Sequence, residues 1–466
     1  MELEQARELI KKCVEGHAYF IWDAEQAERY YRKENDILKT ERKQKEEDDP
    51  LHQADNKIPS NYFKLLVNQK TAYAFTVPPK FDVGEDEINE KIRETLGDAW
   101  KKKCKTLCKE AAKKKVAWLH YWKGKNGEFK YAAVKPEQVV PVWTPDLEKE
   151  LLAVLRYYHD IDQKTGKTYE IYEIWTDKEC QTFRRRVDLE WEALEEYPNF
   201  LILDIDTNTT ENTNIYKHDF QEVPFIFFNN NDEMQSDLDD IKELIDSYDK
   251  VYSGFINDME DIQEIIFILT NYGGEKDSAK EVLQQMKNKI ILVDNDGPDD
   301  KSGVSTLSIE IPVEARREVL KITRNAIFEQ GMGIDPDPQN FGDSSGVALK
   351  YLYSLLELKT GMMETEFEPS FNRLIRAICR FYGYTPKKIT QTWKRTSVTN
   401  NVELAQICNQ SKGIISDETI IRNHPLVTDP DKEIKLLKEQ NERELEKESH
   451  EWDKIPVIPE DGDGKE

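Results

Sequence analysis

Two groups of side chains in this sequence have types and spacing that could bind a metal ion, and the first is a cysteine pair. Cys104 and Cys108 are four residues apart on a lysine-rich segment with helical character, which places both thiols on one helix face. A structural zinc site needs four ligands, and neither a histidine nor a second cysteine pair lies near them in the sequence. The other cysteines are widely scattered. We therefore predict reduced thiols and no metal here.

The second group is the acidic segment Asp294–Asp300, which is similar to a calcium-binding loop in composition. A calcium loop of this kind ends in a glutamate that binds the ion through both carboxylate oxygens. Ser305 occupies the position where that glutamate is needed, and the spacing of the acidic residues is also wrong. We interpret the segment as an ordinary turn.

The short motifs of common enzymes are absent. The sequence has no Gly-x-x-x-x-Gly-Lys-Ser/Thr phosphate loop, no Gly-x-Gly-x-x-Gly and no His-Glu-x-x-His. Its seven histidines never lie within four residues of one another. We predict no catalytic residues, no cofactor and no enzymatic activity. Because catalytic sites assemble in space, a metal-dependent nucleic-acid enzyme stays open as an alternative.

The charge balance argues against tight binding of nucleic acid. The 466 residues include 66 basic and 91 acidic side chains, a net charge of −25, whereas proteins that grip DNA neutralise phosphates with a basic surface. The lysines at the end of the segment 86–115 fit the negative end of a helix dipole as well as they fit a DNA-binding patch. An acidic surface is compatible with a channel that lets DNA slide without sticking. It is equally compatible with an acidic helical scaffold or chaperone, or with a charge that serves only solubility.

The first half of the chain is predicted to contain helices followed by strands. Apolar residues recur at helical spacing over about 2–48, and Ser60 or Asn61 can cap a helix that follows Pro59. A further helix, polar and with a lysine-rich end, is expected over about 86–115. Between Val116 and Phe228 the apolar period shortens to two, which predicts an inserted antiparallel β domain. Its expected strands are 117–122, 129–134, 139–143, 152–158, 168–175 and 182–187.

The second half is predicted to be mainly helical. Ser236 can cap a helix that continues to about Thr270, roughly 50 Å long at the helical rise. A short helix, 279–287, then precedes a hairpin between 289–293 and 304–311. Pro312 begins another helix, and the glycine- and proline-rich loop 331–343 separates it from a long helix over 346–382. The last expected helices are near 401–411, after the cap residue Ser416, and over 431–447, with a polar tail after them.

Three stretches of sequence carry a resemblance to a known family. They are Asn56-Lys-Ile-Pro-Ser-Asn-Tyr with its following helix, the succession of helices, hairpin and loop up to Ser345-Gly-Val-Ala-Leu-Lys, and Gly413–Ile421 with Asn423–Asp429. In this order the sequence resembles the portal proteins of tailed bacteriophages, in their siphophage branch. The resemblance implies an α+β subunit with long helices in a wing, stem and crown, an inserted antiparallel β domain, and a small helix-plus-hairpin clip.

The resemblance also implies a division of the chain. The wing takes 1–235, with the β-rich domain at 116–228, and a long wing and stem helix follows at 236–270. The other parts are the clip at 271–311, a stem helix at 312–330, the tunnel loop at 331–343, a wing helix and connection at 344–397, the crown at 398–450 and a polar tail at 451–466.

The predicted tunnel loop is acidic. No Lys or Arg lies between Gln330 and Ser345, so the loop would repel phosphate.

Three sets of residues are expected to have roles. Those facing DNA from the tunnel loop are Met332, Ile334, Asp335, Asp337, Gln339, Asn340, Phe341 and Asp343. Those on the channel face of the stem helix are Glu314, Arg317, Glu318, Lys321 and Arg324. Those of the clip, contacting an adaptor or a neighbouring subunit, are Lys287, Lys289, Asp294, Asp296, Asp299 and Lys301.

The implied partners follow from the family. Portal proteins form a dodecameric ring at one capsid vertex, through which double-stranded DNA passes without sequence specificity. The large terminase, a head-completion adaptor, and scaffold and major capsid proteins bind that ring. The apolar runs of the sequence are too short to cross a bilayer, and its start lacks the features of a signal peptide. We expect a soluble protein of the virion, present in the bacterial host cytoplasm during assembly.

Overall fold

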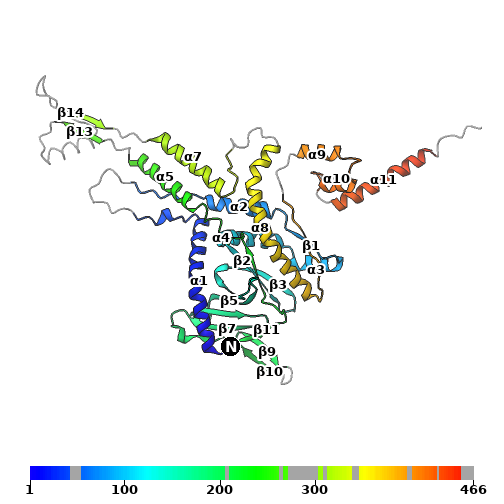
Figure 1. Cartoon of the computed structure of the whole chain (residues 1–466), viewed down its shortest axis with the longest axis horizontal. Helices are drawn as coiled ribbons and strands as arrows, with labels where there is room; N and C mark the ends of the chain where they lie inside the picture. The colour runs from blue at the N-terminus through cyan, green and yellow to red at the C-terminus, as the bar shows by residue number, and fades with distance from the viewer. Residues whose placement is uncertain are drawn as a thin grey trace, which may run out of the picture. The chain divides into compact units, whose positions relative to one another are not determined.

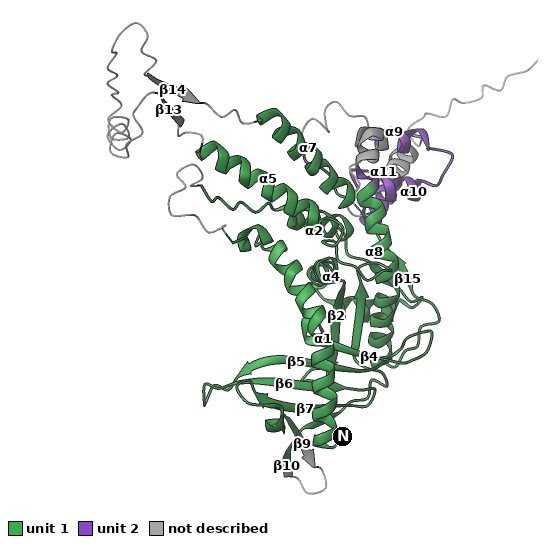
Figure 2. Cartoon of the chain, turned by 60° about the vertical axis from the view of Figure 1, so that its left-hand side comes forward, with its two compact units in different colours: residues 1–335, 355–396 green, residues 336–354, 397–466 purple. Residues whose placement is uncertain are grey.

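The computed structural model describes most of the chain, in two compact units (Figure 2). The described residues are 1–41, 54–204, 209–261, 266–270, 303–307, 312–337, 346–395, 401–427 and 430–452. One unit contains Met1–Asp335 and Leu355–Thr396, and the other contains Pro336–Ser354 and Ser397–Glu466. The structure is a mixture of helices and antiparallel sheets, which confirms the predicted α+β class. Within the described parts, no helix is both long and apolar enough to span a membrane.

The N-terminal helices differ from the prediction in two places. They are α1 (Leu3–Tyr31), the 3-10 turn η1 (Asp36–Lys39), α2 (Tyr62–Ala74), α3 (Asp86–Leu96) and α4 (Trp100–Lys114). The first helix ends at Tyr31, well before residue 48, and Lys33 follows with φ of 66°. The single helix predicted over 86–115 is two helices, because Gly97 lies between them with φ of 64°, a conformation that favours glycine.

All six predicted strands are present, in two antiparallel sheets. The strands of this region are β2 (Val116–Lys123), β3 (Phe129–Val134), β4 (Val139–Trp143), β5 (Leu151–Ile161), β6 (Thr168–Trp175), β7 (Glu179–Arg186), β8 (Glu195–Glu196), β9 (Phe200–Asp204), β10 (Thr209–Thr213), β11 (Ile215–Lys217) and β12 (Phe225–Asn229), with the 3-10 turns η2 (Pro136–Gln138) and η3 (Trp191–Ala193). A three-stranded sheet has the order β12-β2-β3, and a larger sheet has the order β11-β7-β6-β5-β4, with β8 beside β7. A separate hairpin joins β9 to β10.

The helix predicted from Ser236 to Thr270 is shorter than expected. It forms α5 (Lys242–Asp261), while Ile266–Thr270 is a strand, β13, paired antiparallel with β14 (Gly303–Leu307). Residues 304–307 of the predicted strand 304–311 pair with β13, while its predicted partner 289–293 lies outside the described residues, so the hairpin between them stays a prediction. A short apolar run such as Ile266-Phe-Ile-Leu fits a strand as well as a buried helical turn, so periodicity alone could not decide.

The helices on either side of the glycine-rich loop agree with the sequence. α7 (Val313–Gln330) begins after Pro312, and α8 (Gly346–Phe381) follows the loop. The second half of α8 carries Phe367 and Phe371 into the largest core, against the three-stranded sheet, α3 and α4. β15 (Thr390–Thr392) then pairs with β1 (Lys80–Asp82). α5 and α7 lie side by side, with β13 and β14 beyond their ends (Figure 1).

The smaller unit contains the last three helices, α9 (Asn401–Gln410), α10 (Asp417–Asn423) and α11 (Pro430–Trp452). Ser416 caps α10 as predicted, since its Oγ accepts a hydrogen bond from the backbone N–H of Thr419 at 3.3 Å. Arg422 of α10 pairs with Asp431 of α11 at 3.0 Å. This ion pair joins α10 to the first turn of α11.

Candidate functional site

The start of the glycine-rich loop lies directly against α2. A Cβ atom on Gly333 would be 2.1 Å from a methyl group of Leu66, and one on Gly331 would be 2.7 Å from the same side chain. Neither distance is possible for a real side chain, so both positions need glycine for close approach rather than for a turn. The sequence indicated these glycines only as part of the loop that follows α7. In the structure they allow the backbone of the loop to pack directly against α2.

Gln69 of α2 holds the backbone of the loop. Its side-chain carbonyl accepts from the N–H of Ile334 at 3.0 Å, and its amide N–H donates to the carbonyl oxygen of Ile334 at 2.7 Å. The side chain therefore satisfies both backbone polar groups of one loop residue, as a neighbouring strand would. This contact fixes the loop at a single residue, and no local sequence signal reveals it.

A buried cluster of charges lies below the same loop. Lys359 of α8 donates to the carbonyl oxygen of Gly331 at 2.9 Å and pairs with Asp237 at 3.0 Å. Lys70 of α2 pairs with Asp237 at 3.1 Å and donates to Asn230 at 2.7 Å. The side chains of Lys70 and Asp237 are only 2% and 4% exposed, so the cluster is shielded from water. It ties α2, α7 and α8 together at one point.

The electrostatics of this cluster favour an ionised carboxylate. Burial would raise the pKa of Asp237, but the charges of Lys359 and Lys70 and a hydrogen bond from Asn230 bring it down to about 2. Burial lowers the pKa of Lys359, and Asp237 opposes that shift. Removing the carboxylate would leave two buried ammonium groups facing each other, which is why Asp237 is the central member of the cluster.

The predicted tunnel-loop residues divide into two groups. Met332, Ile334, Asp335 and Asp337 lie together just after α7, and all four are partly buried. Asp335 pairs with Arg324 of α7 at 2.5 Å. The remaining predicted residues, Gln339, Asn340, Phe341 and Asp343, lie outside the described residues, as do the predicted clip residues Lys287, Lys289, Asp294, Asp296, Asp299 and Lys301.

The predicted stem residues also divide. Glu314, Arg317, Glu318 and Lys321 are exposed on α7, whereas Arg324 is turned towards the loop and pairs with Asp335. Ile327 is buried, but Val319 is exposed, and so is Ile322, at 46% and 59% respectively. Val313 and Glu329, at the two ends of α7, are exposed as well, so the helix presents both charged and apolar side chains to its surroundings.

The motif that begins at Asn56 is an extended segment, residues 56–60, that lies along α5. Three side chains spaced by four on α5 contact three backbone N–H groups spaced by two on the extended segment. Asp249 accepts from Ser60 at 2.8 Å, Ser253 from Ile58 at 3.0 Å and Asn257 from Asn56 at 2.7 Å. A helix rises about 6 Å in four residues and a strand about 6.6 Å in two, so the two spacings match. The motif holds α5 in place.

The described residues contain no cluster of three or more histidine, cysteine, aspartate or glutamate side chains that could hold a metal ion. Cys104 and Cys108 are both buried, and burial raises the pKa of each thiol, which disfavours the thiolate that binds metals. The arrangement provides an anchored loop and a charged helix surface rather than reactive groups.

Comparison with known proteins identifies the family. A family model described as "Phage portal protein, SPP1 Gp6-like" matches residues 10–447. The chain belongs to the phage portal proteins. The portal protein of Clostridium phage phiCD119 is 40% identical over 468 residues, covering 97% of this chain and 99% of that protein. The portal protein of Bacillus phage SPP1 is 29% identical over 437 residues, covering 88% of this chain and 82% of that protein.

Two solved structures are also similar to this portal protein. The chain aligns with a component of the neck of an empty GTA particle at a TM-score of 0.43 and 11% identity, over 77% of this chain and 88% of that one. It aligns with a component of the neck of a native GTA particle at a TM-score of 0.40 and 11% identity, over 80% and 90%. Likenesses at this level do not establish a shared function.

The family settles the competing interpretations of the sequence. Portal proteins are structural, non-enzymatic components of the virion capsid. The prediction of a portal protein is therefore confirmed, and so is the prediction that the chain is not an enzyme. The helical chaperone and the metal-dependent nucleic-acid enzyme are excluded as its function.

Proposed function

We propose that twelve copies of this portal protein form a ring at one capsid vertex, and that double-stranded DNA passes through the ring during packaging, retention and ejection. The observation that carries the proposal is the family match over 10–447, together with 40% identity along nearly the whole chain of a phage portal protein. Sequence similarity that spans both compact units supports a common architecture rather than a shared fragment.

In this proposal α5 and α7 form the stem of the ring. The two helices are antiparallel, because Arg316 near the start of α7 pairs with Asp258 near the end of α5. At the opposite end, Tyr62 contacts both Tyr248 of α5 and Phe328 of α7 edge to face. β13 and β14 extend from the stem, so the clip begins at residue 266 in this proposal and not at 271. Residues 1–235 and 344–397 would form the wing, and 398–450 the crown.

The loop after α7 would face DNA, and the charges around it suit a conduit. On the exposed surface of α7, Glu314 and Glu318 balance Arg317 and Lys321, Arg324 is neutralised by Asp335, and Glu329 adds one further negative charge. Such a surface offers phosphates no net attraction, which agrees with the overall charge of −25. DNA would therefore slide past, and the energy for movement would come from a partner motor, the large terminase.

Other proposed partners contact separate parts of the ring. A head-completion adaptor would bind the clip, and scaffold and major capsid proteins would bind the wing at the vertex. The polar helices α10 and α11 carry mostly exposed charges and would form the crown inside the capsid.

A loop deletion tests the role of the loop. Removing Asp335–Asn340 should leave ring assembly intact and reduce the yield of packaged or retained DNA in a complementation assay. The matched control removes residues 163–166 from the β5–β6 turn, which is exposed and outside the proposed channel. Normal DNA yield with the loop deletion, in rings of normal size, would contradict the loop assignment.

A further inference from the structure

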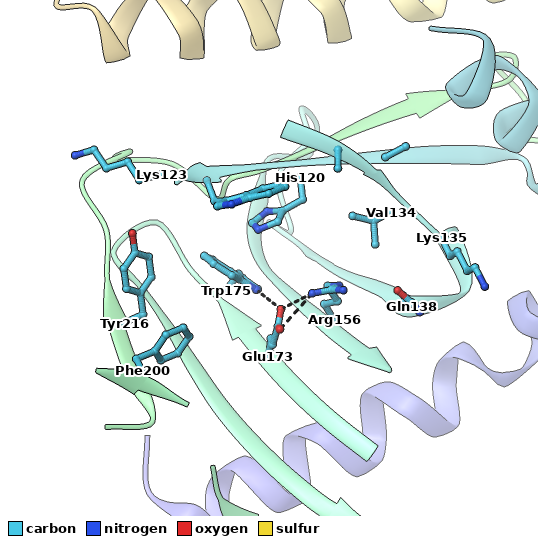
Figure 3. A pocket seen from close by; sticks show the side chains of 13 residues that line it. His120, Lys123, Val134, Lys135, Gln138, Arg156, Glu173, Trp175, Phe200 and Tyr216 are labelled. Carbon is cyan, nitrogen blue, oxygen red and sulfur yellow. Dashed lines mark hydrogen bonds and ion pairs between the residues drawn. The ribbon is translucent and has the colours of Figure 1, made fainter. Parts of the chain in front are cut away.

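A pocket of about 630 Å³ lies between the two sheets of the β region (Figure 3). Its lining includes His120 and Trp122 of β2, Arg156 of β5, Glu173 and Trp175 of β6, and Tyr216 of β11. None of its lining residues belongs to α7 or to the loop after it. The volume is within the range of about 300–1,000 Å³ that ligand pockets occupy.

The walls of this pocket are aromatic and held in place. The His120 ring stacks on Trp122 with centroids 5.5 Å apart, and Phe200 lies 5.3 Å from Tyr216. Trp175 is fixed by its indole N–H, which donates to Glu173 at 3.0 Å. Flat rings already positioned in this way form favourable offset or edge contacts with an inserted aromatic side chain, at little cost in conformational entropy.

Two cationic side chains of the pocket have donors that the described residues do not satisfy. Glu173 is saturated, since Arg156, the Tyr158 hydroxyl and Trp175 all donate to it. The Nε of Arg156 has no hydrogen-bond partner. Lys135, at the rim, is exposed and forms no ion pair with any residue in the described ranges. Since Glu173 offsets Arg156 and Asp219 offsets Lys123, Lys135 is the one uncompensated cation among the lining residues, and it is complementary to an acidic ligand.

One side of the pocket is an unpaired strand edge. β3 pairs only with β2 among the described strands, and four consecutive residues, Ala132 to Lys135, line the pocket. The open part of the edge lies between the Tyr131 carbonyl, which accepts from Lys103 at 2.9 Å, and the Lys135 carbonyl, which accepts from Gln138 at 3.0 Å. Neighbouring residues of a strand point to opposite faces, so consecutive lining residues show that the edge itself borders the cavity. Such an edge offers backbone donors and acceptors to a second extended chain.

We propose that this pocket binds an extended acidic peptide segment of a partner protein. The peptide would pair with the edge of β3, insert an aromatic side chain between Trp122 and Trp175, and place a carboxylate beside Lys135. The free strand edge favours a peptide over a small aromatic acid. This proposal does not depend on the role of the loop or on DNA.

The test uses the assembled full-length protein and a fluorescent peptide, acetyl-Glu-Asp-Trp-Val-Thr-Glu-amide, measured by anisotropy. Three competitors accompany it: the peptide with alanine in place of tryptophan, the peptide with lysine in place of each acidic residue, and N-acetyltryptophan. The protein variants are Lys135→Glu and Trp122→Ala, with Lys164→Glu as the control because Lys164 is exposed on the β5–β6 turn of the same sheet. A thermal melt of each variant reports its folding.

The parent peptide should bind, and both pocket variants should weaken it about tenfold, as expected for loss of an aromatic anchor or a complementary charge. Lys164→Glu should bind like the unaltered protein, and the two altered peptides should compete poorly. If Trp122→Ala fails to fold, the Lys135→Glu result decides. Absence of binding, equal binding to Lys135→Glu, or equal competition by the lysine peptide would overturn the proposal. Competition by N-acetyltryptophan as strong as the peptide's would overturn it in favour of a small-molecule site.

Discussion

Lys359 donates a hydrogen bond to the carbonyl oxygen of Gly331 at 2.9 Å, and so places a buried cation at the C-terminal end of α7. The last carbonyls of a helix have no partner within the helix and carry the negative end of its dipole. Lys359 satisfies one of them from α8, while Asp237 balances its charge. This contact links the two helices that flank the proposed DNA-facing loop.

Substitutions in this cluster should differ in a defined order. Asp237→Asn leaves Lys70 and Lys359 buried without a carboxylate and should lower the free energy of unfolding by about 3–5 kcal/mol. Lys359→Met keeps the Lys70–Asp237 pair and should cost less, about 1–3 kcal/mol. Denaturant unfolding of each variant measures this. A larger loss for Lys359→Met than for Asp237→Asn would show that the carboxylate is not the central member.

The contact between Gly333 and Leu66 should appear as a coupled pair. Gly333→Ala introduces a Cβ that would clash with Leu66, and the variant should be destabilised by about 1–3 kcal/mol. Leu66→Ala removes the obstructing methyl groups, so the double variant should be more stable than the sum of the two single changes predicts.

Gly16→Ala is the control for Gly333→Ala, because a Cβ at position 16 meets no atom within 4 Å. It should stabilise α1 by about 0.5–1 kcal/mol. Strict additivity of Gly333→Ala and Leu66→Ala would rule out the proposed contact.

Charges on the stem surface should control how freely DNA moves. Changing Glu314 and Glu318 to lysine would convert the surface of α7 from slightly acidic to basic in every subunit. Packaging should then be slower, most strongly at low salt, because phosphates would be attracted and salt screens that attraction. The control is Glu8→Lys with Glu25→Lys on α1, which makes the same charge change at exposed positions. Equal slowing by both pairs would mean that net charge, not the α7 surface, is responsible.

The stability of the β region should fall on mild acidification because of His120. Its Nδ1 lies 2.8 Å from the Pro224 carbonyl oxygen, and burial lowers its pKa from 6.5 to about 3. The unfolded chain takes up a proton below pH 6.5 and the folded one does not, so stability is complete above pH 6.5. It falls by about 1.4 kcal/mol per pH unit towards pH 3.

Unfolding measured from pH 8 to pH 4 tests this expectation with His120→Phe. The variant should lose part of the decline below pH 6.5, whereas at pH 8 only the lost hydrogen bond and packing should matter. A decline of the same slope in both proteins would contradict the assignment to His120.

Sequence reasoning succeeded where local signals determine structure. Pro312 and Gly331 bound α7, Ser416 caps α10, and alternation of apolar residues located the strands. It failed over Ile266–Thr270, where a short apolar run fits two periods. The anchors of the loop were also beyond it, because Lys70 and Asp237 are 167 positions apart, and Gln69 and Ile334 are 265 apart. Such pairs form only once the chain has folded. The sequence around Lys70 does not differ from the sequence around a lysine on a helix surface.

The most direct test of the proposed function is the state of assembly of the purified full-length protein. Negative-stain electron microscopy with two-dimensional averaging, combined with mass photometry, gives both the shape and the number of subunits. The account predicts closed rings with a central channel and a mass of twelve 54.6 kDa subunits. Monomers or dimers alone at high protein concentration, with no closed ring, would contradict it.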